Sequence, residues 1–198
     1  MATSDVQICN MSLKRIGISK SISSFNDGSL ESRLCGEFYA PMRDLVLQMY
    51  LWPHAQKYAT LVKVADEPNS RWLYAYALPT DCIRVDHILT GNPREQNPPP
   101  YDEGNLAGIG RVMFTDWVDP EIKYTMRFED TVFFPPAFTS ALAWRIGMEL
   151  APPLSRSDDE IQKATIQFGM EMSIAESVSY QGSQQHKRTD MSEANRAR

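Results

Sequence analysis

The sequence predicts an α+β fold, in which a bundle of about four helices carries a small antiparallel β-sheet inserted in the middle of the chain. Apolar residues recur at helical spacing near both ends of the sequence. Between residues 57 and 130 they alternate with polar residues instead, as in strands with one wet face. We expect one domain over residues 1–180, with helices at 4–17, 29–52, 136–150 and 157–180, followed by a tail at 181–198.

The first predicted helix, over residues 4–17, places Val6, Cys9, Leu13 and Ile16 on one face. Thr3 or Ser4 can cap its N-terminus, and Gly17 stands where a helix commonly ends in a left-handed residue. Residues 18–29 are rich in Ser, Asn and Gly and predict a loop.

The second predicted helix, over residues 29–52, can be capped by Ser29 or Asp27. Pro41 lies inside it and predicts a kink, or a break into two helices near Tyr39. The stripe expected to face the core consists of Leu30, Leu34, Phe38, Met42, Leu45, Met49 and Trp52. Only Gln48 is strongly polar between Leu45 and Trp52, so this segment must be covered on nearly every side.

Strands are predicted where large apolar residues alternate with polar or small ones: Trp72–Tyr76, Ile83–Ile88, Val112–Phe114 and Ile122–Phe128. Residues 90–110 are rich in Pro and Gly and predict a long loop that contacts something or is mobile. The glycines of GNLAGIG have the wrong spacing for a dinucleotide-binding loop and are interpreted as a flexible loop tip.

The third helix carries the strict i+4 series Phe138, Leu142, Ile146 and Leu150, widened by Ala141, Trp144 and Met148. Ser157 and Glu160 form a capping box for the last helix. Its predicted buried face is Ile161, Ala164, Phe168, Met172, Ala175 and Val178. Residues 181–198 contain one Met and no other large apolar residue, and are expected to be disordered.

The composition argues against several classes of protein. The net charge is −5 and the body of the chain has no basic cluster, which disfavours nucleic-acid binding because that rests on Lys and Arg. No apolar stretch approaches the roughly 18–20 residues of a transmembrane helix, and no signal-peptide pattern is visible, so we expect the protein to remain in the cytoplasm where it is made. The cysteines, Cys9, Cys35 and Cys82, are interpreted as small buried apolar residues.

Motifs for chemistry are missing from the sequence. It contains no HExxH, GxSxG or P-loop pattern, and its three histidines, His54, His87 and His186, are far apart. We therefore predict no enzyme, no catalytic residue, no cofactor and no metal. Acidic residues do gather near two strand ends, namely Asp116, Asp119, Glu121, Glu129 and Asp130. A carboxylate pair is all that a glycosidase needs, although acidic residues also favour turns for ordinary solvation reasons.

A series of segments resembles one family over residues 5–180. In order, the chain reads ICNMSLKRIG, SLESRLCGEFYAPMRDLVLQMYLWPHA, WLYAYALPTDCIRV, VMFTD, IKYTMRFED and PPAFTSALAWRIGMELAPPL. These segments resemble the tail tubular protein A family, the head-to-tail adaptors (gatekeepers) of short-tailed bacteriophages. The most telling parts are Arg43-Asp44, Trp52-Pro53, residues 78–84 and Thr115-Asp116. Pro53 and His54 depart from the Trp-x-Phe-Ala of the family.

The resemblance implies a structural virion protein of the phage tail, made in the host cytoplasm and active in DNA ejection. Twelve copies would form a ring that binds the portal protein and extends the DNA channel. The ring would also provide a platform for a tail nozzle protein, similar to tail tubular protein B, and for the tail fibre protein. DNA would pass through the lumen without sequence-specific binding, and no membrane would take part.

Such a ring gives the apolar helices a function. In a closed heterologous ring, one face of each subunit meets a different face of the next subunit. Core burial in the monomer remains the alternative for this apolar surface. The expected subunit-interface residues are Tyr39, Arg43, Tyr50, Trp52 and Trp144, and the expected portal-binding residues of the tail are Lys187, Arg188, Arg196 and Arg198.

Two other functions stay open. The first is a cell-envelope hydrolase acting on peptidoglycan or polysaccharide, alone or as a second role of the adaptor, with Asp116, Glu121 and Glu129 as its acids. The second is a small cytoplasmic binding domain unrelated to phage, which would be a monomer indifferent to any portal.

Overall fold

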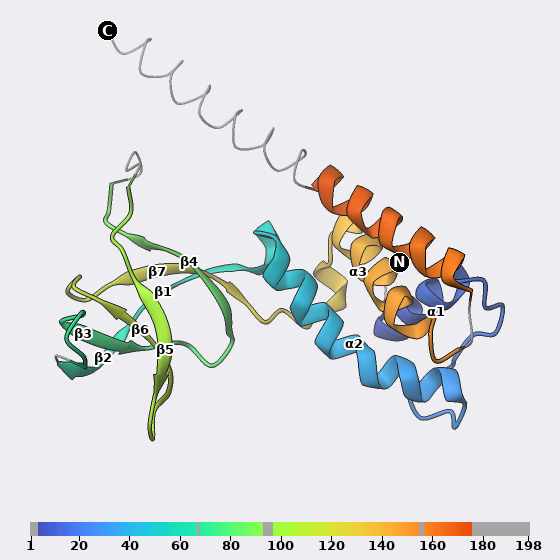
Figure 1. Cartoon of the computed structure of the whole chain (residues 1–198), viewed down its shortest axis with the longest axis horizontal. Helices are drawn as coiled ribbons and strands as arrows, with labels where there is room; N and C mark the ends of the chain where they lie inside the picture. Colours follow the sequence, from blue (N-terminus) through green and yellow to red (C-terminus); the bar gives the residue numbers. More distant parts are fainter. Residues whose placement is uncertain (1–3, 67, 93–96, 155–156, 176–198) are drawn as a thin grey trace, which may run out of the picture. The chain divides into compact units, whose positions relative to one another are not determined.

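The computed structural model describes residues 4–66, 68–92, 97–154 and 157–175. It divides the chain into two compact units, one made of residues 1–50 and 130–198 and the other of residues 51–129. The first is helical and the second is built from antiparallel strands (Figure 1). The predicted α+β class, with four helices and a β insertion in the middle of the chain, is confirmed.

The helical unit is organised around α3 (Pro136–Leu150), which packs against both α1 (Asp5–Arg15) and α2 (Leu30–Met49). A further helix covers residues 158–175. Figure 1 shows α3 at the centre of this unit, with the other helices around it. Its buried residues are Phe138, Thr139, Ala141, Leu142, Ala143, Ile146, Gly147 and Leu150. The core of the unit therefore forms where the sequence has its strictest i+4 apolar series.

The helix ends follow local signals in the sequence. Ser4 caps α1 in a capping box, because its side chain accepts from the Gln7 amide and the Gln7 side chain accepts from the Ser4 amide. Gly17 ends the helix with a φ of 79°, a left-handed conformation that glycine adopts without strain. Ser29 caps α2 by accepting a hydrogen bond from the amide of Ser32.

Of the two outcomes expected at Pro41, a kink or a break into two helices, the break does not occur. The helix α2 is one element from Leu30 to Met49, and Pro41 lies inside it. Proline removes one amide donor from the helix and leaves the carbonyl four residues earlier, that of Glu37, without its helical hydrogen bond. Both Glu37 and Pro41 are exposed, so water can reach this place in the helix.

The buried face of α2 also differs from the prediction. The residues that it buries are Ser32, Cys35, Tyr39, Arg43, Val46 and Leu47. The predicted stripe from Leu30 to Met49 lies about 100° around the helix axis and is half-buried or exposed. Trp52, the last residue of that stripe, is buried, but it lies beyond α2 in the β unit. The prediction failed because apolar residues occupy more than one side of α2, and Arg43 is buried among them.

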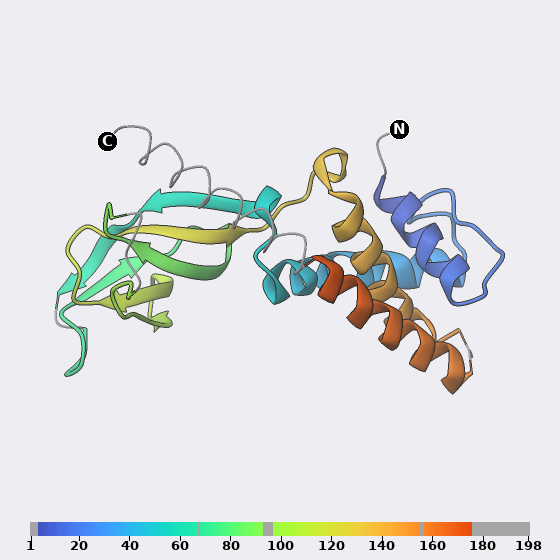
Figure 2. The same ribbon diagram turned by 90° about the horizontal axis from the view of Figure 1, so that it is seen from above.

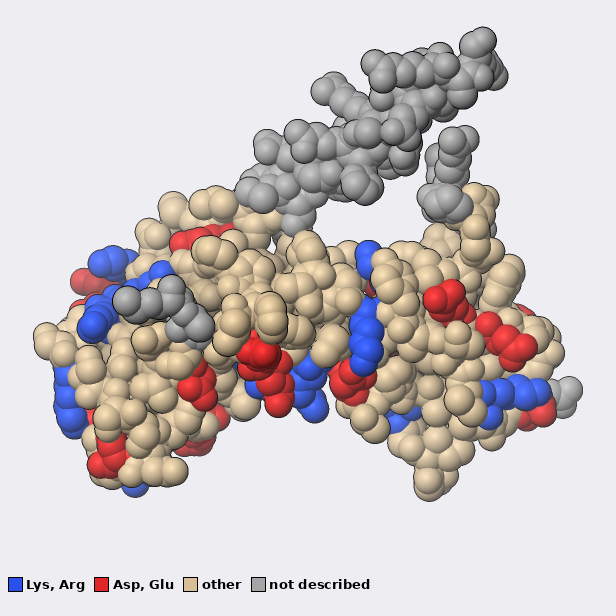
Figure 3. Space-filling model, turned by 180° about the vertical axis from the view of Figure 1, so that it is seen from behind, with Lys and Arg blue, Asp and Glu red and all other residues tan. Residues whose placement is uncertain are grey.

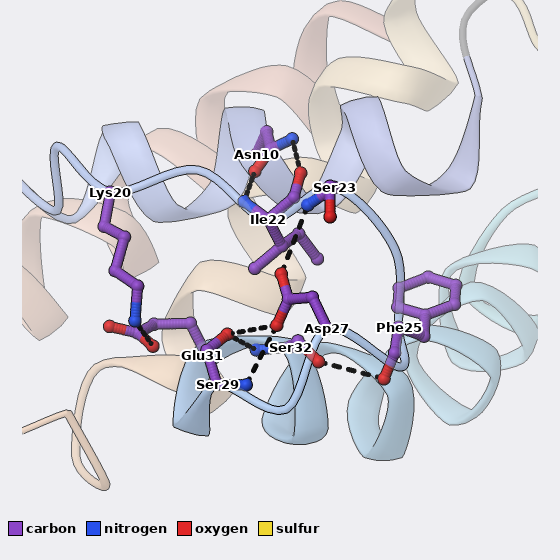
Figure 4. A network of polar contacts seen from close by, with 9 residues as sticks. All are labelled: Asn10, Lys20, Ile22, Ser23, Phe25, Asp27, Ser29, Glu31 and Ser32. Atoms are coloured by element: carbon purple, nitrogen blue, oxygen red, sulfur yellow. Dashed lines mark hydrogen bonds and ion pairs between the residues drawn. The ribbon is translucent and has the colours of Figure 1, made fainter.

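The loop between α1 and α2 is held by specific hydrogen bonds (Figure 4). The side chain of Asn10 exchanges two hydrogen bonds with the backbone of Ile22, at 2.8 and 2.9 Å. Asp27 accepts hydrogen bonds from the hydroxyl and the amide of Ser29 and from the amide of Ser23. These hydrogen bonds, chiefly the two from Ser29, lower the pKa of Asp27 to about 2. The predicted loop is thus a defined structure.

The β unit consists of two antiparallel sheets, with strand orders β1-β7-β4 and β2-β3-β6-β5. The strands are β1 (Gln56–Thr60), β2 (Val62–Asp66), β3 (Tyr74–Ala77), β4 (Cys82–Leu89), β5 (Asp102–Leu106), β6 (Gly110–Thr115) and β7 (Glu121–Met126). Figure 2 shows the chain passing from β1 directly into β2, so that one stretch serves both sheets. The residues buried between the sheets are Leu61, Tyr76, Leu78, Cys82, Val85, Ile88, Met113, Ile122 and Tyr124.

Part of the predicted long loop is a β-hairpin. β5 lies inside residues 90–110 and pairs with β6, and the turn between them runs over residues 107–109. Gly108 and Gly110 have φ values of 79° and 99°, which glycine adopts readily. GNLAGIG, which the sequence predicted to be a flexible loop tip, thus forms the end of β5 and the turn of a hairpin, and its glycines shape that turn. Gly104 has a packing role, since a Cβ at this position would lie 2.6 Å from the Phe114 ring.

Candidate functional site

The helix over residues 158–175 has two apolar faces. The inner face buries Ala164, Phe168, Met172 and Ala175, which confirms these members of the predicted stripe. The opposite face carries Ile166, Met170 and Ile174, whose side chains are 56%, 54% and 54% exposed. These three residues are spaced by i+4 and form one line along the helix, here called the outer row. A helix that is apolar on two sides is expected to be covered on both.

A second apolar surface follows α2. Leu30 and Met49 at its ends are 45% and 49% exposed. Between them Leu34, Phe38, Met42 and Leu45 are only half-buried. These six residues, here called the α2 row, are all but Trp52 of the stripe that the sequence predicted to face the core. The most apolar face of this helix, as judged from the sequence, is therefore not completely covered by the chain.

The two helices that carry these rows meet at one end. The Tyr50 hydroxyl, just beyond α2, donates a hydrogen bond of 3.3 Å to the carbonyl oxygen of Ala175. From this point the helices diverge, as Figure 1 shows. The two rows thus belong to one structural unit but to different helices.

One face of the helical unit includes surface without charged side chains. In the view of Figure 3, tan areas lie between the patches of Lys, Arg, Asp and Glu on this unit. Val132 and Phe133, in the short helix Thr131–Phe133, add two further exposed apolar side chains to this unit. Scattered apolar residues are normal on a protein surface, whereas aligned rows on neighbouring elements mark interaction sites.

Three of the five predicted interface residues are covered by the chain itself. Tyr39 and Arg43 belong to the buried face of α2, and Trp52 is buried near the start of the β unit. Arg43 donates two hydrogen bonds from Nε and Nη2 to one carboxylate oxygen of Asp44, at 2.9 and 2.8 Å. Tyr39 and Arg43, which the sequence suggested as subunit-interface residues, thus belong to the face of α2 that the chain itself buries.

The other two predicted interface residues, Tyr50 and Trp144, are half-buried. Trp144 lies under the guanidinium of Arg15, and Arg15 also donates to the backbone carbonyl and the hydroxyl of Ser140. The Ser140 hydroxyl donates in turn to the Glu171 carboxylate at 2.7 Å. Burial lowers the pKa of Arg15, and the charge of Glu171 opposes that shift. This network joins α1, α3 and the helix over residues 158–175.

The predicted portal-binding residues, Lys187, Arg188, Arg196 and Arg198, lie outside the described residues, as does Val178. Their role therefore stays a prediction from the sequence.

Two of the carboxylates proposed for a hydrolase, Glu121 and Glu129, do not form an arranged pair. Asp116 accepts a hydrogen bond of 2.8 Å from the Leu73 amide and so caps the start of β3. Glu121 begins β7, whereas Glu129 follows the end of that strand at Met126. At a rise of about 3.4 Å per residue, the length of β7 alone exceeds the roughly 5–9.5 Å that separates the acids of a glycosidase.

The described residues offer no metal centre, since no group of three or more His, Cys, Asp or Glu side chains is arranged to hold an ion. A hollow of about 600 Å³ opens at the end of β4 and is lined by Asp86, His87, Ile88, Leu89, Thr90, Gly91, Asn92, Pro98 and Glu121. Asp86 is already engaged there by His87 Nδ1 at 3.1 Å and by Lys123 Nζ at 3.6 Å. The carboxylate of Asp86 therefore already has two partners at this hollow.

The comparisons with known proteins do not assign a family. No family model matches the chain, and no curated protein matches it significantly. None of the helices that the structure describes is long and apolar enough to cross a membrane. Because of their exposed apolar side chains, the two rows of the helical unit are the best-supported candidate site. The sequence signal that could have revealed the outer row is the i+4 spacing of Ile166, Met170 and Ile174.

Proposed function

We propose that this protein is a structural head-to-tail adaptor of a short-tailed bacteriophage, a ring-forming subunit placed between the portal protein and the tail nozzle. The proposal rests on the ordered segments that resemble the tail tubular protein A family and on one structural observation. That observation is the pair of apolar rows on the helical unit, which the single chain leaves partly exposed.

The occupant that fits these rows is a second copy of the chain. A closed ring needs two different faces on each subunit, one for each neighbour. The outer row and the α2 row provide two such faces on two helices of one unit. In this arrangement the outer row of one subunit packs on the α2 row of the next, and both become buried.

The size of the hydrophobic effect limits how much free energy of association one row can supply. Fully burying a large aliphatic side chain contributes about 1.5–3 kcal/mol, so each half-exposed side chain of the outer row contributes about 1 kcal/mol. Association itself costs about 4–15 kcal/mol. The three residues of the outer row therefore do not suffice alone, and a stable ring requires the α2 row and contacts with the portal.

The remaining parts of the chain take the other roles of an adaptor. The tail over residues 181–198 carries Lys187, Arg188, Arg196 and Arg198 against Asp190 and Glu193, and would order along the portal on binding. The β unit would face the nozzle and the tail fibres. DNA would pass through the lumen, where an acidic protein does not hold phosphates tightly.

The test is the native mass of the protein, alone and mixed with the portal protein of the same phage, measured by native mass spectrometry. We expect a ring of twelve copies on the portal. A chain that stays monomeric in both samples would overturn the proposal and favour a small binding domain. Recovery of the protein in purified virions checks its place in the tail independently.

The hydrolase alternative has no structural observation in its favour. Asp116 is used as a cap, and Glu121 and Glu129 stand at opposite ends of β7. Absence of turnover on peptidoglycan and polysaccharide at high protein concentration would remove this alternative.

A further inference from the structure

The loop between β6 and β7, residues 116–120, here called the tip loop, presents apolar side chains to the solvent. Trp117 and Val118 in this loop are 42% and 61% exposed. Leu73, whose amide donates a hydrogen bond to the Asp116 carboxylate, is 50% exposed. Single exposed aliphatic residues are normal on a protein surface, whereas an exposed tryptophan in a loop is typical of an interaction site, because Trp is among the residues most enriched in binding hot spots.

Two buried hydroxyl groups hold the tip loop in one conformation. The Tyr76 hydroxyl donates a hydrogen bond of 3.0 Å to the carbonyl oxygen of Trp117 and accepts one of 3.2 Å from the amide of Asp119. The Thr115 hydroxyl accepts a hydrogen bond from the Trp117 amide and donates one to the carbonyl oxygen of Pro100. Tyr76 and Thr115 are each only 1% exposed, so the core of the β unit fixes the backbone that carries the exposed side chains.

The backbone of the tip loop is strained at Asp119. Its φ is 48°, and among the described residues it is the one non-glycine residue with a positive φ. Such strain persists only where the surroundings impose it, and it is common at ligand-binding sites. On one side of Asp119 the loop is held by Tyr76, and on the other the Pro120 carbonyl oxygen accepts a hydrogen bond of 2.9 Å from the Leu61 amide. The fixed geometry reduces the entropy that is lost when a partner binds the loop.

The tip loop and its flanks are negatively charged. Residues 115–122 read TDWVDPEI, with Asp116, Asp119 and Glu121 and no Lys or Arg. All three carboxylates are exposed, and no Lys, Arg or His of the described part of the chain lies within ion-pair distance of them. This charge repels phosphate groups, which disfavours nucleic acids and anionic lipids as ligands. The complementary ligand is a protein pocket with an apolar floor and a rim of Lys and Arg.

We propose that the tip loop docks into a pocket of this kind on the tail nozzle protein. Trp117 and Val118 are the inserted side chains, and Asp116 and Asp119 pair with basic residues of the rim. The inference rests on the proposed adaptor function, because it assigns the nozzle contact of that adaptor to one loop. The arrangement has the form of a binding hot spot, in which an aromatic anchor is surrounded by a polar rim that excludes water.

The first test is hydroxyl-radical footprinting of Trp117, read by peptide mass spectrometry. It compares the full chain alone, the chain assembled on the portal protein, and the same assembly with the nozzle protein of the same phage bound. We expect Trp117 to be oxidised readily in the first two samples and several-fold more slowly in the third. Protection already present without the nozzle would place a neighbouring copy or the portal on the loop and would overturn the proposal. Unchanged oxidation with the nozzle bound would overturn it as well.

Variants of the tip loop test the same contact by affinity. Val118→Lys adds a cation that a basic rim repels, and the affinity of the assembled adaptor for the nozzle protein should fall about 30-fold or more, as at a typical hot spot. Trp117→Ala should have a similar effect, and if it fails to fold, Val118→Lys carries the test. Ile109→Lys is the matched control, because Ile109 is also an exposed aliphatic residue but lies just before the other end of β6. Equal affinities of Val118→Lys and Ile109→Lys would overturn the proposal.

The charge of the rim is tested separately with Asp119→Asn. Asparagine tolerates the left-handed backbone, so the loop keeps its conformation and loses one negative charge. We expect weaker binding to the nozzle and a smaller dependence of the affinity on salt concentration. An unchanged salt dependence would contradict the basic rim.

Native mass spectrometry of the natural chain with the portal separates the two possible failures. Absence of a ring would overturn the adaptor function, and this inference with it. A ring that does not bind the nozzle, or a Val118→Lys ring that binds it as tightly as the natural ring does, would overturn only the assignment of the tip loop.

Discussion

Arg15 of α1 lies over the indole ring of Trp144 in α3, with its guanidinium carbon 4.5 Å from the ring centroid. The same guanidinium donates to the carbonyl and the hydroxyl oxygens of Ser140 at 2.6 and 2.8 Å. The charge is thus placed between a ring face and two hydrogen-bond acceptors, at the junction of three helices. Trp144, which the sequence suggested as an interface residue, has a partner within its own chain.

Removing this charge should destabilise the helical unit. Arg15→Met keeps most of the apolar stem but loses two hydrogen bonds and the cation–π contact. We expect the free energy of unfolding to fall by about 2–3 kcal/mol, as measured by urea denaturation followed by circular dichroism. Lys14→Met, at the exposed neighbouring position, is the control and should change stability by less than about 0.5 kcal/mol. Equal effects of the two changes would contradict the assigned role of Arg15.

His54 should make the β unit sensitive to acid. Burial lowers the pKa of His54 from 6.5 to about 4, and the ring packs edge-on against Phe128 with centroids 5.3 Å apart. Between pH 6.5 and about 4 the unfolded chain binds a proton that the folded protein does not. The free energy of unfolding therefore falls as the pH falls through this window, by about 1–3 kcal/mol in total, and this contribution levels off below it.

The check is a pair of urea titrations, at pH 7.5 and pH 5, on the natural protein and on His54→Phe. The phenylalanine keeps the aromatic contact but cannot bind a proton, so its stability should fall less between the two pH values. Identical pH dependence of the two proteins would show that His54 does not titrate as its burial predicts.

The outer row should matter for assembly and not for folding. Met170→Glu places a charge in the middle of the row, where the side chain is exposed in the single chain but would be buried in a ring. We expect an unchanged circular dichroism spectrum and loss of the ring from native mass spectra with portal present. Ser173→Glu adds the same charge at an exposed position off the row and should leave the ring intact. Rings of normal size from Met170→Glu would remove the outer row from the interface.

Deletion of residues 181–198 should separate folding from portal binding. All helices and strands that the structure describes lie before this segment. We therefore expect unchanged thermal unfolding and weaker attachment to the portal, measured by co-sedimentation. Full attachment of the shortened chain would mean that Lys187, Arg188, Arg196 and Arg198 take no part in docking.

Two helical glycines should respond to alanine in opposite directions. Gly169 is exposed, and a Cβ there meets nothing within 4 Å, so Gly169→Ala should stabilise the protein by about 0.5–1 kcal/mol. Gly147 is buried, and a Cβ there would lie 3.2 Å from Cγ2 of Ile16, which is itself fully buried. Gly147→Ala should therefore destabilise the packing of α1 on α3, and urea titration of both variants measures the difference.

Sequence periodicity correctly predicted the buried face of a helix wherever one apolar series dominates, and capping residues correctly predicted helix ends. The strict i+4 series from Phe138 to Leu150 marked the central helix, and the inner face of the last described helix was also correct from Ala164 to Ala175. The alternating residues around Tyr76 and Tyr124 marked strands that form the core of the β unit. These features are local, because spacing along the chain determines which side chains share a face.

The sequence therefore determined the α+β class, the order of the elements, and most helix ends, while only the tertiary structure decided which faces are buried. In α2, apolar residues occupy more than one side. Their spacing is therefore equally compatible with burial of the face that contains Leu34 and with burial of the face that contains Cys35. Packing against α3 selected the second face and buried Arg43 on it. The physical reason is that burial depends on neighbours contributed by distant segments, and spacing along one segment carries no information about them.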